Sequence, residues 1–135
     1  YQESHRQVSF RFSADETLPP ILLDRDQIKR VLINLLDNAV DALGPEGGSI
    51  DIETGYNPEL GIATFTVADT GHGISAEDKP RLFEPYFSTK KAGTGLGLAI
   101  VNTIITDHRG FIRVRDNEPK GTKFIIELPA SGTFM

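Results

Sequence analysis

The chain has 135 residues, 39% of them hydrophobic and 24% charged, and contains no cysteine. This composition suits one globular domain with its own core and excludes disulfides and thiolate chemistry. The net charge of -5 argues against broad nucleic-acid binding. No apolar run is long enough to span a bilayer, no signal peptide is recognisable, and we expect the chain to be a piece of a longer protein.

The first half of the chain predicts a strand followed by a long helix. Residues 8–15 alternate apolar and polar side chains, which is typical of a half-buried strand. Asp24 is the predicted N-cap of the helix, with Gln27 three residues later as in a capping box, and Gly44 and Pro45 end the helix. Its apolar positions form one buried stripe: Ile28, Val31, Leu32, Leu35, Leu36, Ala39 and Leu43.

Two further strands and a less regular region follow. Residues 47–55 and 61–71 are predicted to be strands on either side of a turn. A short helix is predicted over residues 76–83, capped by Ser75. Residues 84–97 lack a clean periodicity and are predicted to form a loop.

The last third predicts a helix over residues 98–107 and an antiparallel strand pair over 110–117 and 121–129. Strand pairs separated by helices predict an α+β fold, a two-layer α/β sandwich with helices on one face of one sheet. We expect one domain over residues 1–130 and a frayed tail over 131–135.

Three polar side chains lie on one side of the first predicted helix. Asn34, Asn38 and Asp41 fall within about 60° of one another on a helical wheel, and Asn38 borders the apolar stripe. Asparagine is a poor helix former, and its amide oxygen can bind a hard cation such as Mg²⁺. A solvated helix face with incidental asparagines is the alternative interpretation.

The strand predicted over residues 61–71 runs into the sequence D-T-G-H-G, which begins at Asp69. A carboxylate at a buried strand end needs hydrogen-bond donors, and an exocyclic amine is a suitable one. A tight turn without a ligand is the alternative. We expect His72 to be an exposed loop residue, since no second His or Cys stands at metal-ligand spacing.

The sequence GTGLGLAI, residues 93–100, places glycines at alternate positions directly before a helix. Glycine permits close approach, and a helix start offers unpaired N–H groups, so the pattern indicates a phosphate site or, alternatively, a plain turn. An acidic protein that binds polyphosphate is also expected to use a divalent cation. A Rossmann site fits less well, because G-x-G-x-x-G should follow a strand directly.

The order of five motifs resembles the catalytic domain of sensor histidine kinases, in the wider family of gyrase B, Hsp90 and MutL. The matching segments are NLLDNAVDA, DTGHGI, RLFEPYFSTK, GTGLGLAIV and GTKF, which resemble the N, G1, F, G2 and G3 boxes. The resemblance extends over about residues 24–128 and further suggests the nitrogen-regulation class, NtrY in particular. It implies the Bergerat fold, a mixed, mostly antiparallel sheet with about three helices on one face.

The resemblance implies a role for individual residues in binding ATP and Mg²⁺. Asn38 matches the magnesium-binding asparagine, and Asn34 a second position near the metal and phosphates. Asp69 matches the residue that binds the adenine amino group, beside the glycines Gly71 and Gly73. Other positions implied to contact or enclose the nucleotide are Asp41, Ile74, Phe83, Phe87, Gly93, Thr94, Gly95, Leu96, Gly97, Leu98 and Thr122.

Two positions depart from relatives within this wider family. Many of the kinases carry a basic residue where this chain has Asp41, so we expect Lys90 or Lys91 to contact phosphate instead. The hydrolysing relatives carry a glutamate where this chain has Asn34, and an amide cannot act as a general base for water. The amide at Asn34 favours a kinase over a hydrolase.

The implied activity is transfer of the γ-phosphoryl group of ATP to a histidine on a separate dimerisation domain, absent from this chain. His5 lacks the helical context of such an acceptor. We expect this domain to be cytoplasmic and monomeric when isolated, and the whole protein to be a homodimer that signals to a response regulator, with no nucleic-acid partner. The alternatives are an ATPase of the same superfamily and a non-catalytic nucleotide- or partner-binding module.

Overall fold

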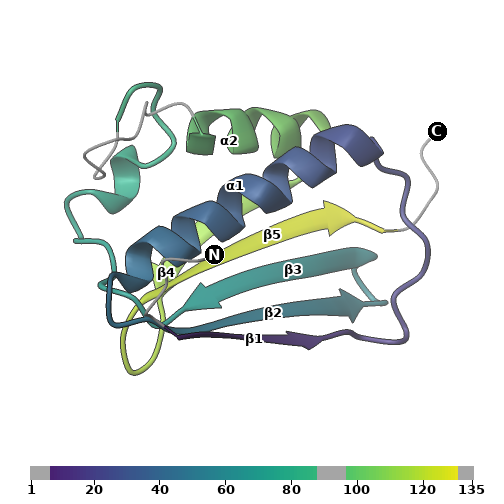
Figure 1. The fold of residues 1–135 in the computed structure, drawn as a ribbon. Coiled ribbons are helices and arrows are strands. Elements are labelled where there is room, and N and C mark those ends of the chain that lie inside the picture. Colours follow the sequence, from purple (N-terminus) through teal and green to yellow (C-terminus); the bar gives the residue numbers. More distant parts are fainter. Residues whose placement is uncertain (1–6, 88–96, 131–135) are drawn as a thin grey trace.

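In the part of the chain that the structure describes, a five-stranded sheet carries two α-helices on one face (Figure 1). The computed structural model describes residues 7–87 and 97–130. In chain order the elements are β1 (Val8–Ser13), α1 (Arg25–Leu43), β2 (Gly48–Asn57), β3 (Ile62–Asp69), the 3₁₀ turn η1 (Lys79–Arg81), α2 (Gly97–Asp107), β4 (Phe111–Asp116) and β5 (Thr122–Pro129). The predicted α+β sandwich is thereby confirmed.

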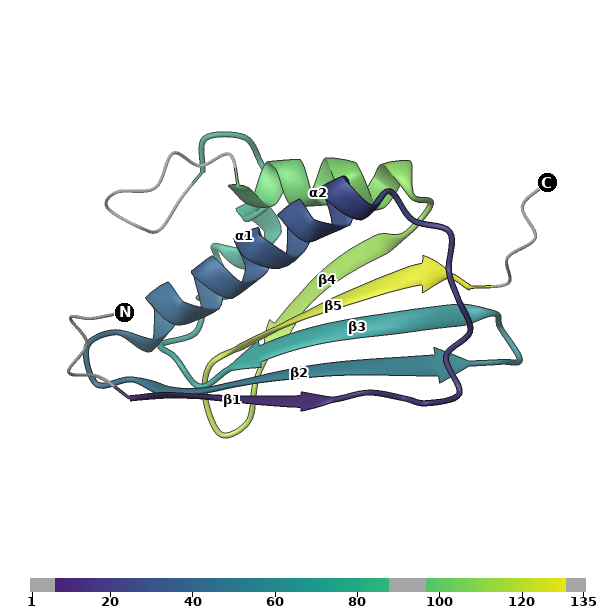
Figure 2. The same cartoon turned by 45° about the vertical axis from the view of Figure 1, so that its right-hand side comes forward.

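The sheet has the order β1-β2-β3-β5-β4. β1 runs parallel to β2, and the other three pairings are antiparallel, so the sheet is mixed and mostly antiparallel as expected. A turn that contains Glu118 and Pro119 joins β4 to β5. Both views place α1 and α2 together above the same face of the sheet (Figures 1 and 2).

The long helix α1 begins and ends where the sequence predicts. The side chain of Asp24 accepts a hydrogen bond from the Gln27 N–H at 3.1 Å, and Gly44, with a φ of 72°, ends the helix. The capping box is incomplete, because the Asp24 N–H donates to Nε2 of His108 at 3.0 Å rather than to Gln27. This bond ties the segment after α2 to the start of α1.

The apolar stripe of α1 packs against the sheet and against α2. Four of its predicted members are buried, and Ile28, Leu32 and Leu36 are half-buried at its edges. The core lies between the helices and the inner face of the sheet. Its buried members from these elements are Val31, Leu35, Ala39, Leu43, Ile50, Val67, Val101, Ile104, Ile105, Phe124, Ile126 and Leu128.

The prediction of a half-buried first strand is wrong. Only Val8 of β1 is partly buried, whereas Phe10 and Phe12 are 56% and 66% exposed. The register pairs these phenylalanines with Ile50 and Ile52, so they lie on the helix-bearing side of the sheet. α1 packs on β2 and β3, so the edge strand β1 lies beyond the area that α1 covers (Figure 2).

The helix predicted over residues 76–83 is reduced to the short turn η1. Oγ of Ser75 accepts a hydrogen bond from the Asp78 N–H at 3.1 Å, which caps the turn before η1, whereas η1 itself has Asp78 as its N-cap and no side-chain cap. Pro80 explains the difference, because proline lacks an N–H and its ring clashes with the carbonyl four residues earlier in an α-helix. The described residues therefore contain two α-helices rather than about three.

The other differences are small. α2 begins at Gly97, one residue before its predicted start, and the tail over residues 131–135 lies outside the described part of the chain. None of the helices in the described ranges combines the length and the apolar character needed to cross a membrane.

Candidate functional site

Asp69, the last residue of β3, is a buried carboxylate with two backbone donors. Only 3% of the residue is exposed. Its Oδ1 accepts hydrogen bonds from the N–H of Gly71 at 2.8 Å and of Thr122 at 3.3 Å. Burial raises the pKa of Asp69 above its ordinary value of 3.8, although these two N–H groups act in the opposite direction.

The second carboxylate oxygen of Asp69 is left available. Within the described residues Oδ2 receives no hydrogen bond, and no buried side-chain oxygen or nitrogen lacks a partner. Oδ2 therefore keeps some solvent-accessible surface. An acceptor oxygen that is fixed in place and still open can bind an amino group that enters from solvent.

The turn after β3 lies against the C-terminal part of α1 because Gly71 has no side chain. A Cβ at Gly71 would stand 2.3 Å from the carbonyl oxygen of Ala42. The same carbonyl accepts a hydrogen bond from the N–H of His72 at 3.0 Å. His72 itself is exposed, as predicted, with Nδ1 2.7 Å from the carbonyl oxygen of Gly73.

Gly121 brings β5 equally close to β3. Its φ is 108°, and a Cβ there would stand 1.9 Å from the carbonyl oxygen of Asp69. We expect Gly121→Ala to lower the free energy of unfolding by about 3 kcal/mol, measured by urea denaturation, because backbone cannot yield as a side chain can.

Gly55→Ala is the matched control for this prediction. A Cβ at Gly55 would meet only Oγ1 of Thr64, at 2.7 Å, and this side chain can rotate. Gly55→Ala should lower the free energy of unfolding by less than about 1 kcal/mol. Equal losses for the two variants would contradict the close approach of Gly121 to Asp69.

The asparagines of α1 direct their amide N–H groups back along the helix. Nδ2 of Asn34 donates to the carbonyl oxygen of Arg30 at 3.0 Å, and Nδ2 of Asn38 donates to that of Asn34 at 2.8 Å. Both side chains are half-buried, as expected for Asn38. Because the amide nitrogens are used in this way, the two side-chain oxygens remain as acceptors or cation ligands.

Asn34 also lies directly beside the start of α2. A Cβ at Gly97 would stand 3.0 Å from Oδ1 of Asn34, so a glycine lets the two helices approach here. The first turn of a helix carries unpaired N–H groups and the positive end of its dipole. The amide oxygen of Asn34 thus lies next to the N-terminus of α2. Asp41 lies further along α1 and is exposed.

The two phenylalanines after η1 pack against the core, whereas Tyr86 is exposed. Phe83 contacts Phe124 of β5 edge to face, with ring centroids 6.4 Å apart, and Arg81 stacks over Phe87 at 4.4 Å. Phe83 and Phe87 are partly buried against the core, as are the predicted site residues Ile74 and Leu98. Thr122 is buried beside Asp69, and Gly73 is half-buried in the turn.

The remaining predicted site residues belong to the segment between Phe87 and α2. Lys90, Lys91, Gly93, Thr94, Gly95 and Leu96 lie outside the described residues. Their predicted contacts with phosphate therefore stay predictions.

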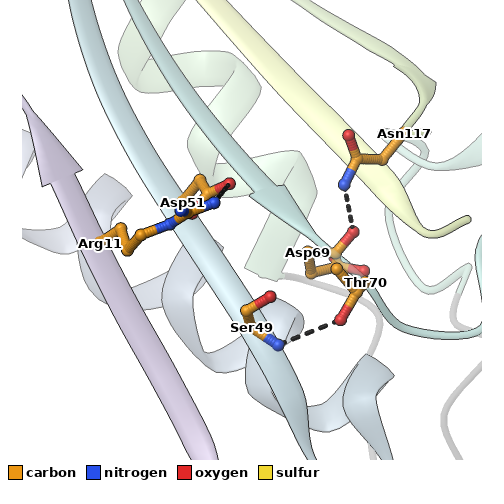
Figure 3. A network of polar contacts seen from close by, with 6 residues as sticks. All are labelled: Arg11, Ser49, Asp51, Asp69, Thr70 and Asn117. Atoms are coloured by element: carbon orange, nitrogen blue, oxygen red, sulfur yellow. Dashed lines mark hydrogen bonds and ion pairs between the residues drawn. The ribbon is translucent and has the colours of Figure 1, made fainter. Parts of the chain in front are cut away.

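Sequence reasoning missed several side chains around Asp69. Nδ2 of Asn117 donates to the carbonyl oxygen of Asp69 at 2.7 Å, and Oγ1 of Thr70 accepts a hydrogen bond from the N–H of Ser49 at 3.0 Å (Figure 3). Nζ of Lys79 donates to the carbonyl oxygen of Ile74 at 3.0 Å. Asn117 and Asp69 are far apart in sequence and belong to different hairpins, so no local pattern could have indicated their contact.

Comparisons with known proteins agree with this geometry. Residues 23–132 match the family described as histidine kinase-, DNA gyrase B- and HSP90-like ATPase. The sensor histidine kinase ZraS of Escherichia coli (strain K12) is 41% identical over 128 residues, 95% of this chain and 27% of that protein. The sensory histidine kinase/phosphatase NtrB of Rhizobium leguminosarum bv. phaseoli is 37% identical over 139 residues, 93% of this chain and 36% of that protein.

The chain thus spans 27% and 36% of the lengths of these two relatives. NtrB fits the predicted nitrogen-regulation class, while the finer assignment to NtrY stays a prediction.

A solved structure gives the same result at the level of the domain. The nucleotide-free catalytic domain of histidine kinase ThkA superposes with a TM-score of 0.80 at 39% identity, over 91% of this chain and 79% of that chain. The resemblance read from the five boxes is confirmed. The chain belongs to the histidine kinase-, DNA gyrase B- and HSP90-like ATPase family, and within it to the catalytic domains of sensor histidine kinases.

Proposed function

We propose that this domain binds ATP together with Mg²⁺ and transfers the γ-phosphoryl group to a histidine side chain on a separate dimerisation domain. The observation that carries the proposal is the amide of Asn34 beside the first residue of α2. An amide can bind or orient a ligand there, but it cannot remove a proton from water.

The adenine end of the site is formed around Asp69. Its open Oδ2 accepts a hydrogen bond from an exocyclic amine, while Gly71 and Thr122 hold Oδ1 in place. Adenine presents an amino group at the position where guanine presents a carbonyl oxygen. Two acceptors facing each other repel, so the site favours ATP over GTP.

The phosphate end of the site is formed by α1 and the start of α2. The side-chain oxygens of Asn34 and Asn38 suit Mg²⁺, which prefers oxygen ligands, and the N–H groups that begin α2 suit phosphate oxygens. Bound Mg²⁺ would neutralise charge on the phosphates. The N-terminus of α2 adds further positive potential, which comes from its unpaired backbone N–H groups.

The chemical step needs a nucleophile from outside the described residues. An imidazole nitrogen of the acceptor histidine forms a bond to the γ-phosphorus while the bond from that phosphorus to the bridging oxygen breaks. ADP leaves with the electron pair, and the imidazole releases its proton to solvent. The domain contributes positioning and electrostatic stabilisation, which are the main requirements of phosphoryl transfer.

The comparisons support the wider setting of this proposal. One solved relative is the histidine kinase ThkA in complex with the response regulator protein TrrA, at 35% identity over 92% of this chain. We infer a response regulator as the downstream partner and a homodimer as the state of the whole protein. The domain would then act as a cytoplasmic monomeric unit joined to its dimerisation domain.

A phosphotransfer assay tests the proposal. The domain is mixed with the separately expressed dimerisation domain of the same protein and with ATP labelled on the γ-phosphate. We expect acid-labile, alkali-stable label on the dimerisation domain, and none when its histidine is replaced by glutamine. If this chain alone released inorganic phosphate at the rates of the hydrolysing relatives, the argument from Asn34 would fail.

A further inference from the structure

We propose that Lys79, Asp116 and Asn117 are positioning residues that hold the adenine-binding loop in place. That loop, here called the base loop, comprises residues 69–74. The inference rests on the proposed function, since it takes the base loop to be the part of the site that binds adenine. It assigns to the junction of β4 and β5 a role that the five sequence boxes do not include.

Asn117 fixes the start of the base loop. Its Nδ2 donates to the carbonyl oxygen of Asp69 at 2.7 Å, and its own N–H donates to the carbonyl oxygen of Gly121 at 3.0 Å. Asn117 is half-buried and is held through both its side chain and its backbone. Because the carbonyl and the side chain of Asp69 branch from one Cα, fixing the carbonyl also fixes the position and direction from which the carboxylate projects.

Lys79 fixes the other end of the base loop. Its Nζ donates to the carbonyl oxygen of Ile74 at 3.0 Å and pairs with Oδ1 of Asp116 at 2.8 Å. Only 23% of the Lys79 side chain is exposed, against 68% of Asp116. An ion pair this exposed adds little stability. Its effect is geometric, because it holds the ammonium group where the carbonyl of Ile74 meets it.

The two anchors meet at one turn. Asp116, the last residue of β4, pairs with Lys79, which holds Ile74, and the next residue, Asn117, holds Asp69. Lys79 also belongs to η1, which leads into the anchored aromatic residue Phe83. Through the pair of Asp116 with Lys79, the turn after β4 therefore contacts both the base loop and the segment that contains η1 and Phe83.

Loss of either anchor should weaken recognition of the base and leave the phosphate end unchanged. The base loop carries Asp69 and Gly71, whereas the proposed phosphate contacts come from α1 and the start of α2. A residue that only stabilises the fold would not discriminate between these two ends. The affinity for ATP compared with that for inorganic tripolyphosphate separates the two roles.

The test uses calorimetric titration of ATP, GTP and inorganic tripolyphosphate, each with Mg²⁺, into the wild-type chain and its variants. We expect Asn117→Ala and Lys79→Ala each to lower ATP affinity about tenfold, the effect of one lost hydrogen bond. The preference for ATP over GTP should shrink, and tripolyphosphate affinity should stay within twofold of wild type. Lys79→Arg should restore most of the ATP affinity, because it keeps both the charge and a donor.

Two further variants sharpen the test. Arg113→Ala removes an ion pair between β4 and β5, 2.6 Å from Glu127, that touches no base-loop residue, and it should bind ATP like wild type. Combining Asp116→Ala with Lys79→Ala should add nothing to Lys79→Ala alone, because the two act through one contact.

Unchanged ATP affinity in both single variants would overturn the inference. An equal loss of ATP and tripolyphosphate affinity would overturn it as well, since that indicates general loosening. A wild-type chain that bound no ATP would instead overturn the proposed function.

Discussion

Replacing Asp69 by asparagine is expected to lower ATP affinity about a hundredfold while leaving the protein fully folded. Asparagine retains an oxygen that can accept from Gly71 and Thr122, but it puts an N–H₂ group where Oδ2 stood. An amino group of the ligand then faces a donor instead of an anionic acceptor. A lost charge-assisted hydrogen bond accounts for about 1.5–3 kcal/mol, or roughly tenfold to more than a hundredfold in affinity.

The stability of this variant should move in the opposite direction from its affinity. Burial raises the pKa of Asp69, so the folded protein binds this proton more tightly than the unfolded chain does. As pH rises from the ordinary value of 3.8 through the raised pKa, ionisation of Asp69 lowers stability. Asp69→Asn removes that cost, so its unfolding temperature at pH 7 should equal or exceed that of wild type.

Calorimetric titration with ATP and thermal unfolding at pH 7 together check this prediction. Asp51→Asn is the matched control, because Asp51 of β2 pairs with Arg11 of β1 at 2.9 Å (Figure 3). Ile50 is the register partner of Asp69, so Asp51, the next residue, projects from the opposite face of the sheet. The control should bind ATP normally. A large drop in the unfolding temperature of Asp69→Asn would mean that the carboxylate serves the fold rather than the ligand.

Replacing Asn38 by alanine is expected to slow phosphotransfer to the dimerisation domain by about a hundred- to a thousandfold, the usual effect of removing one group that stabilises transition-state charge. Its described side-chain hydrogen bond goes only to a carbonyl oxygen of the same helix, so the fold should tolerate the change. The variant should also lose most of the increase in ATP affinity that Mg²⁺ produces. Initial rates of labelling and titrations with and without Mg²⁺ measure both effects.

Lys29→Ala provides the control on the same helix. Lys29 is exposed and lies about 180° around α1 from Asn38 at 100° per residue. It should phosphorylate the dimerisation domain at the wild-type rate. If Asn38→Ala kept both its rate and its response to Mg²⁺, the assignment of the α1 amides to the metal would be withdrawn.

The parts of the fold that depend on local pattern could be predicted from the sequence. Asp24, the apolar stripe and Gly44 define α1 almost to the residue, since caps and periodicity are properties of neighbouring residues. The helix predicted over residues 76–83 rested on the Ser75 cap, whereas Pro80 restricts this segment to the short turn η1.

The parts that depend on tertiary arrangement could not be predicted in this way. Alternation in β1 correctly indicated a strand, but burial of Phe10 and Phe12 depends on where α1 sits across the sheet. The site shows the same division. Asp69, Asn34 and Asn38 stand in recognisable motifs, whereas Asn117 reaches Asp69 only because β3, β4 and β5 share one sheet.

Calorimetric titration of the wild-type chain with ATP, in the presence of Mg²⁺ and then in its absence, tests directly whether this domain binds the nucleotide with the metal. We expect saturable binding of one ATP per chain, tighter with Mg²⁺ than without it, and weaker binding of GTP under the same conditions. An absence of saturation at millimolar ATP with Mg²⁺ present would contradict it.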